Sequence, residues 1–224
     1  MKRIFAVYGI AYIILLMYVI GLLLVYPKLE LHLLLNSCHT NFQDTFFKYY
    51  SMLAEGPLYV LALLPLFWKK VRMILFFALC ELTGGAVLQL LKHLFSAERP
   101  VSVFALHQDM MFPVVEGVEL HEGNSFPSGH AFTFFVFFTC CALFLAYYYR
   151  NRIKQNSIGT WAPLSLSLLA LLLLATLGAY SRVYLSQHFL VDVCVGSIIG
   201  VVTPCLFFYF GRNKILKLNK NEEE

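Results

Sequence analysis

Long apolar stretches separated by short polar ones run along the whole sequence. Each is close to the roughly 20 residues that a helix needs to cross the hydrocarbon layer of a membrane. Six stretches are long enough or nearly so: 4–26, 46–68, 73–95, 131–149, 161–180 and 189–210. The pattern predicts an all-α, polytopic membrane protein with six transmembrane helices, folded as a single domain over residues 1–224.

Composition supports lipid as the solvent. Hydrophobic residues make up 59% of the chain and charged residues only 13%, about half of what a soluble domain carries. Lys2 and Arg3 precede the first stretch as in a signal peptide, but the stretch is too long for a signal core and no small-residue cleavage site follows it. We therefore expect a retained signal-anchor helix.

Basic residues predict the orientation. If the six helices alternate, twelve of the 17 lysines and arginines fall on one side, which the positive-inside rule assigns to the cytoplasm. These twelve are Lys2, Arg3, Lys69, Lys70, Arg72, Arg150, Arg152, Lys154, Arg212, Lys214, Lys217 and Lys220. Both termini are then cytoplasmic. The net charge of +4 reflects this topology, and we expect no nucleic-acid partner.

Two segments outside the predicted helices bear on the organisation. Residues 28–45 mix leucines with polar residues and are expected to lie along the membrane interface as a short amphipathic piece. The longest loop, 96–128, lies on the outer side and carries several acidic residues that are expected to keep it solvated. Residues 213–224 are predicted to be a disordered tail.

Polar residues gather in three clusters where a membrane protein would otherwise avoid them. The first occupies 92–100, at the end of the third predicted helix, and the second occupies 127–130, opening the fourth. The third, 181–192, joins the fifth and sixth. With alternating helices, all three lie at the outer ends of helices 3 to 6, and this convergence follows from charge and hydropathy alone.

The second cluster is able to bind an anion. Ser128 is a plausible N-cap, which would leave the backbone N–H groups of Gly129 and His130 without helical acceptors. Such N–H groups and the helix dipole attract anions. Taken alone, an ordinary capped helix with an unrelated histidine explains the same residues.

The third cluster holds a histidine and a carboxylate four residues apart. On one helix face, Asp192 would lean back toward His188 and accept its Nδ1–H, leaving Nε2 free as a nucleophile. A structural pair or half of a metal site are the alternatives. The metal alternative is disfavoured because Lys92, Arg99 and Arg182 would repel a cation.

These three basic residues complete the candidate chemistry. Singly, each could extend toward lipid head groups. Together on one face, they require a compensating anion, and a phosphoryl group supplies two negative charges and several acceptor oxygens.

The three clusters resemble the three-part signature of the type 2 phosphatidic acid phosphatase superfamily, and every fixed position is filled in the right order. The matching residues are Lys92, Arg99 and Pro100, then Pro127, Ser128, Gly129 and His130, then Ser181, Arg182, His188 and Asp192. Pro100, Pro127 and Ser181 support the signature without a chemical role.

The resemblance implies a role for each remaining position. His188 would attack phosphorus and become a phosphohistidine, supported by Asp192, while His130 would protonate the leaving oxygen and then activate water. The phosphate-binding positions are Lys92, Arg99, Ser128, Gly129 and Arg182. No metal and no cofactor is implied, because lysine and arginine supply the positive charge.

The resemblance also implies a lipid phosphate as substrate. The small size of the chain and its lack of Asn-x-Ser/Thr sequons favour a bacterial inner membrane, and the predicted topology places the site on the outer face. Undecaprenyl diphosphate, phosphatidylglycerol phosphate and phosphatidate are the expected candidates, with lipid A phosphates as an alternative, and no obligate protein partner is evident. A transporter or channel remains a rival from another class, because Glu55 and Glu81 lie within predicted spans and buried carboxylates often mark ion paths. An inactive scaffold is a third alternative.

Overall fold

The computed structural model describes residues 2–55, 71–107, 109–153 and 158–215, and all regular secondary structure within these ranges is helical. The helices are α1 (Lys2–Val25), α2 (Lys28–Leu35), α3 (Asn41–Met52), α5 (Val71–Phe95), α6 (Pro100–Ala105), α7 (Gly129–Ile153), α8 (Ile158–Tyr184) and α9 (Leu190–Ile215). The predicted all-α class is confirmed.

Five segments of the described chain are long and apolar enough to cross a membrane. They are Ile4–Val25, Val71–Ala105, Gly129–Tyr149, Trp161–Tyr184 and Leu190–Gly211. Five of the six predicted spans therefore have a counterpart, and the helices extend a few residues beyond several of the apolar runs. Because α9 continues to Ile215, the predicted tail is helical at its start, and its remainder, 216–224, lies outside the described residues.

The second predicted span, 46–68, is not one helix from its start. Its first residues belong to α3, which begins at Asn41 because the Thr40 hydroxyl accepts the Gln43 amide. The helix ends in a tighter turn, in which the Leu53 and Ala54 amides bond carbonyls only three residues back. The rest of this span, 56–70, lies outside the described residues, so a sixth transmembrane helix stays a prediction.

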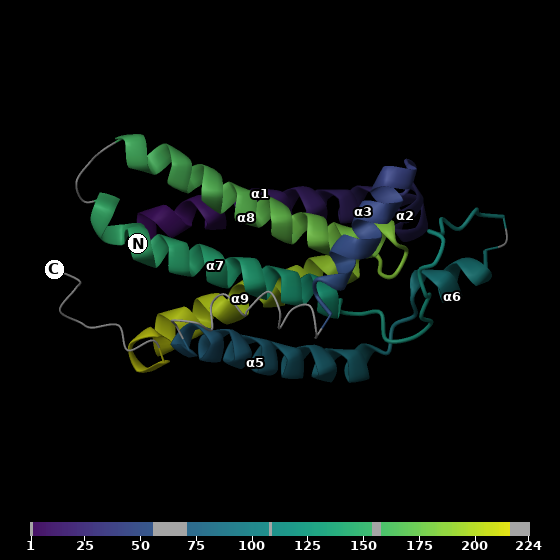
Figure 1. The fold of residues 1–224 in the computed structure, drawn as a ribbon. Helices are drawn as coiled ribbons and strands as arrows, with labels where there is room; N and C mark the ends of the chain where they lie inside the picture. The colour runs from purple at the N-terminus through teal and green to yellow at the C-terminus, as the bar shows by residue number, and fades with distance from the viewer. Residues whose placement is uncertain (1, 56–70, 108, 154–157, 216–224) are drawn as a thin grey trace.

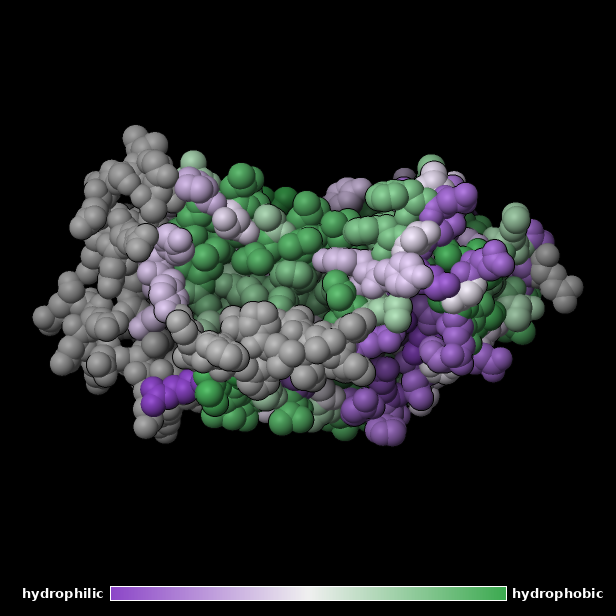
Figure 2. All heavy atoms as spheres, viewed as in Figure 1, coloured by the Kyte–Doolittle hydropathy of each residue, from purple (hydrophilic) through white to green (hydrophobic). Residues whose placement is uncertain are grey.

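The long helices run side by side as a bundle (Figure 1). The start of α1, the start of α5 and the end of α9 lie at one end, whereas α2, α3 and α6 lie at the other. In Figure 2 hydrophobic side chains cover the middle of the visible face, and hydrophilic ones gather at the end that carries α3 and α6. Large apolar side chains such as Ile14, Leu82 and Leu166 are exposed along the helices, as expected for surfaces that face lipid.

Helix α7 is the centre of the bundle and contacts α1, α5, α8 and α9. Its packing against α9 is unusually close, because a Cβ added at Gly196 would lie 2.5 Å from the Ser128 carbonyl oxygen, and one at Gly200 would lie 2.7 Å from that of Phe132. Two glycines four residues apart form the spacing that lets transmembrane helices approach backbone to backbone. This approach brings the start of α9 against the start of α7.

We expect Gly196→Ala to force α9 away from α7. The added methyl meets backbone rather than a movable side chain, so the cost should be roughly 1–3 kcal/mol of stability, as for overpacked cores. The melting temperature of the purified protein in detergent should fall measurably. Gly85→Ala on α5 is the matched control, because nothing lies within 4 Å of the added Cβ; equal melting temperatures for both variants would contradict the close approach.

Candidate active site

The start of α7 is built as the sequence predicts. The Ser128 hydroxyl accepts the Ala131 amide at 3.4 Å, and the Ser128 carbonyl accepts the Phe132 amide at 3.2 Å. Ser128 is thus the N-cap, and its side chain is fully buried. Gly129 and His130, the first two residues of the helix, line a cavity, where their N–H groups have no acceptor within the helix.

The third cluster differs from its prediction in the place of His188 and in its contact with Asp192. His188 precedes α9 instead of lying on it, because α9 begins at Leu190. Asp192, in the first turn, accepts the backbone N–H of Phe189 at 3.0 Å, the reciprocal half of a capping box. Asp192 therefore fixes the entry into α9 and, with it, the position of the residue just before, His188.

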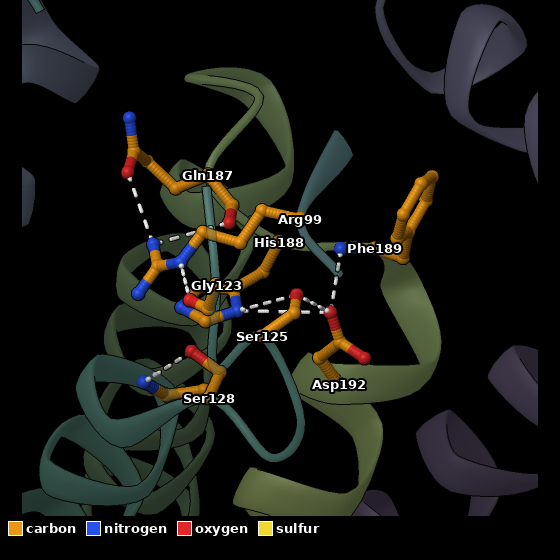
Figure 3. Close-up of polar contacts among 9 residues, drawn as sticks. Arg99, Gly123, Ser125, Ser128, Gln187, His188, Phe189 and Asp192 are labelled. Carbon is orange, nitrogen blue, oxygen red and sulfur yellow. Dashed lines mark hydrogen bonds and ion pairs between the residues drawn. The ribbon is translucent and has the colours of Figure 1, made fainter. Parts of the chain in front are cut away.

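Ser125 connects the histidine to the carboxylate. The His188 Nδ1 atom lies 3.6 Å from Asp192 Oδ2, too far for the predicted direct hydrogen bond. The Ser125 hydroxyl donates to Asp192 Oδ2 at 2.5 Å and lies 3.4 Å from His188 Nδ1 (Figure 3). Because this hydroxyl donates to the carboxylate, it can accept from Nδ1–H, which places the free lone pair of His188 on Nε2.

The protonation state of His188 suits a nucleophile. Burial, together with the positive charges of Arg99 and Arg182, lowers the pKa of His188 to about 4, against the opposing effect of Asp192. A histidine whose pKa is lowered in this way stays neutral at neutral pH, so its Nε2 lone pair is available.

A backbone hydrogen bond joins the two halves of the site. The Ser128 amide donates to the Asp192 carbonyl at 3.0 Å, which links the N-cap of α7 to the first turn of α9. The anion-binding start of α7 and the histidine that precedes α9 are therefore held in one register.

Arg99 ties the long loop to the loop that precedes α9. Its Nε donates to the Gly123 carbonyl at 2.9 Å, and its Nη1 donates to the Gln187 side chain at 3.2 Å (Figure 3). The Gln187 amide group in turn donates to the Glu119 carbonyl at 2.9 Å. Arg99 is thus oriented by carbonyl groups and not by a carboxylate, which leaves its positive charge available to an anion.

Arg182 is buried beneath the same cavity, in the last turn of α8. Its Nη1 donates to the hydroxyl of Ser51 on α3, and its Nε is buried without a hydrogen-bond partner among the described residues. The Arg182 carbonyl accepts the amides of Gln187 and His188, so the same residue carries the charge and shapes the loop of the histidine. A buried guanidinium N–H without an acceptor is costly, and a phosphoryl oxygen would satisfy it.

The site is built around one cavity of about 470 Å³. Six of the predicted site residues line it: Lys92, Arg99, Gly129, His130, Arg182 and His188. Ser128 and Asp192 lie behind its wall, buried, as supports. Pro100 begins α6, and Ser181 donates to the Gly178 carbonyl inside α8, so neither reaches the cavity.

Several further residues at the site were missed by the sequence interpretation. Ser125 precedes the second cluster by only two residues, and its proximity to that cluster was the available signal. Lys48, Ser51 and Glu55 come from α3 and the turn after it, far along the chain from the clusters, and Glu55 Oε1 lies 3.9 Å from His130 Nε2. The other carboxylate of the transporter alternative, Glu81, accepts the hydroxyl of Thr133 between α5 and α7.

Comparison with known proteins identifies the family. The model of the PAP2 superfamily matches residues 73–216, well over half of the chain and all three polar clusters. The chain belongs to the PAP2 superfamily. It is therefore a membrane-embedded phosphatase, and the predicted family resemblance is confirmed.

One solved structure supports the same fold. The crystal structure of Aquifex aeolicus LpxE is 24% identical in sequence, with a TM-score of 0.59, over 83% of this chain and 98% of that chain. At this identity the likeness concerns the fold. A search of curated protein sequences found no match.

We expect Ser125→Ala to lower the kcat of phosphate release by roughly 10- to 100-fold, the usual cost of losing a supporting partner, with little change in KM. The variant removes the bridge to Nδ1 but keeps every group that faces the cavity. Ser102→Ala is the control, because its hydroxyl donates to the Glu122 carbonyl in the same loop and touches neither histidine. A Ser125→Ala enzyme with wild-type kcat would mean that His188 does not need the bridge from Ser125 to Asp192.

Proposed function

We propose that this PAP2 phosphatase hydrolyses the phosphate ester or diphosphate of a membrane lipid. The observation that carries the proposal is one cavity, at one end of a bundle of apolar helices, in which His130 and His188 meet four basic side chains. The apolar outer surfaces of the bundle extend to the end that carries the cavity. A lipid can therefore place its head group in the cavity while its tail stays in the membrane.

In the proposed first step, Nε2 of His188 attacks phosphorus and forms a P–N bond. The bond to the lipid oxygen breaks, and its electron pair leaves with that oxygen, which His130 protonates. In the second step, the now neutral His130 takes a proton from water, and the water oxygen attacks phosphorus. The P–N bond breaks, inorganic phosphate leaves, and both histidines return to their starting states.

Positive charge stabilises this transfer. Lys92, Arg99 and Arg182, together with the N–H groups at the start of α7, would surround the equatorial oxygens of the phosphoryl group. Ser128 contributes as the cap that orients those N–H groups. The cluster places cations where a metal site would place carboxylates, so we propose that the reaction needs no metal.

We propose the class of lipid that the cavity accepts. Undecaprenyl diphosphate, phosphatidylglycerol phosphate and phosphatidate all present a terminal phosphate on an apolar tail, and each suits a cavity at the end of the bundle. Lipid A phosphates are the second candidate, favoured by the shared fold with Aquifex aeolicus LpxE. The proposal requires neither a protein partner nor a nucleic acid.

The proposed location is a bacterial inner membrane, with both termini in the cytoplasm and the cavity on the periplasmic side. Support comes from the twelve basic residues that the topology assigns to one side against five on the other. Of those five, Lys48, Lys92, Arg99 and Arg182 line the cavity, where an anionic head group explains their presence.

Purified protein in detergent should release phosphate from at least one lipid phosphate, and excess EDTA should not reduce the rate. Phosphate release across a panel of the four candidate lipids measures both the class and the preference. His188→Ala should abolish release and Asp192→Asn should severely impair it, because a nucleophile and its orienting carboxylate act as a unit. Full activity in His188→Ala, or loss on chelation that magnesium restores, would contradict the mechanism.

The orientation can be tested with a cysteine that the protein already has. Cys38 is exposed and lies between α2 and α3 at the cavity end. A membrane-impermeant thiol reagent should label it in intact cells. In a Cys38→Ser background, Val71→Cys at the opposite end should be labelled only after the cells are opened; the reverse pattern would place the cavity in the cytoplasm.

A further inference from the structure

The turn after α3 brings a carboxylate to the second histidine of the site. Glu55 lines the catalytic cavity, and its Oε1 lies 3.9 Å from His130 Nε2. The Glu55 amide bonds the Met52 carbonyl at 2.9 Å, which fixes the turn that directs this residue. Glu55 precedes the stretch matched by the family model, which begins at residue 73, so the three-part signature does not include it.

The surroundings of His130 make this carboxylate significant. Lys92, Arg99, Arg182 and His188 all face the same cavity and act on His130 electrostatically. Positive neighbours disfavour a protonated imidazole, yet a leaving oxygen can be protonated only by an imidazole that carries the proton. Lys48, Glu119 and His121 also line the cavity, and Glu55 is the carboxylate whose Oε1 lies 3.9 Å from His130 Nε2.

The Nε2 atom of His130 is also poised for a partner. It is buried and makes no hydrogen bond among the described residues. A separation of 3.9 Å is too long for a hydrogen bond, but the Glu55 side chain is half exposed and can approach. Catalytic hydrogen bonds commonly tighten when the substrate binds, and a head group in the cavity would exclude water and strengthen the attraction.

We infer that Glu55 is a positioning residue for His130: its negative charge stabilises the protonated imidazole, which then gives a proton to the leaving oxygen. The inference rests on the proposed function and extends it, because it pairs each histidine with its own carboxylate: His188 with Asp192, and His130 with Glu55. Glu55 acts through His130 and does not bind the phosphoryl group, since a carboxylate repels that anion.

This role predicts that the effect of Glu55 depends on the leaving group of the substrate. A lipid alkoxide is a poor leaving group and needs the proton, whereas an aryl oxide such as p-nitrophenolate leaves without it. Removing the charge of Glu55 should therefore slow the hydrolysis of alkyl phosphates and leave the hydrolysis of aryl phosphates nearly unchanged. Anion affinity should be unchanged or stronger, because one negative charge has left the cavity.

The experiment compares the wild type with Glu55→Gln, using phosphatidate and p-nitrophenyl phosphate as substrates and vanadate as the binding probe. We expect kcat on phosphatidate to fall roughly 10- to 100-fold, which is part of the roughly 10²–10⁴-fold that proton donation supplies. The kcat on p-nitrophenyl phosphate should change by less than about threefold. The basic limb of the kcat–pH profile on phosphatidate should move to lower pH, because the protonated form of His130 has lost its carboxylate.

Two further variants separate positioning from general effects. Glu55→Asp keeps the charge on a shorter side chain and should recover part of the phosphatidate kcat and the wild-type pH profile. Glu98→Gln removes an exposed carboxylate near the cavity end and should change neither the substrate ratio nor the profile. Thermal melting of each variant confirms that the fold is intact.

The outcomes separate the role of Glu55 from the proposed function. Equal losses on both substrates, an unmoved pH profile, or vanadate binding weakened as much as kcat would each overturn the role of Glu55. A wild-type enzyme without activity on any lipid phosphate would instead overturn the proposed function. Wild-type activity with an indistinguishable Glu55→Gln enzyme would remove only the inference about Glu55.

Discussion

The close approach of α7 and α9 is the constraint on which the rest of the structure depends. Gly196 and Gly200 allow the two backbones to meet, and the hydrogen bond from the Ser128 amide to the Asp192 carbonyl sets their register. In a membrane, apolar side chains gain little by turning away from lipid, so helix association relies on tight packing and such polar contacts. The same contacts bring the anion-binding start of α7 against the histidine that precedes α9.

The cavity concentrates positive charge that the rest of the structure must compensate. Four basic side chains and three histidines line one cavity at the end of an apolar bundle, and Arg182 is buried. Burying positive charge is costly unless anions or hydrogen bonds compensate. Here, carbonyl groups orient Arg99, the Ser51 hydroxyl accepts from Arg182, and two carboxylates stand beside the histidines. The arrangement leaves a net positive cavity that a phosphoryl group can neutralise.

Much of this could be predicted from the sequence because the signals are local. Long apolar runs define transmembrane helices whatever their neighbours are, since each helix satisfies its own backbone hydrogen bonds. Basic residues at alternate ends then place the three polar clusters at one end of the bundle. The cap at Ser128 and the family signature depend on residues only a few positions apart, and the structure gathers the signature histidines, Gly129 and the three basic residues around one cavity.

Only the tertiary structure determined the contacts between residues that are distant along the chain. Ser125 meets His188 across 63 residues, and Ser51 meets Arg182 across 131. Glu55 lies 3.9 Å from His130, in a turn within the second predicted span. The end of α3 at Met52 and the place of His188 outside α9 likewise depend on capping bonds. Hydropathy determines which segments enter the membrane because it sums over many residues. A bridging hydroxyl or a facing carboxylate depends on single atoms whose positions are set by how the helices pack.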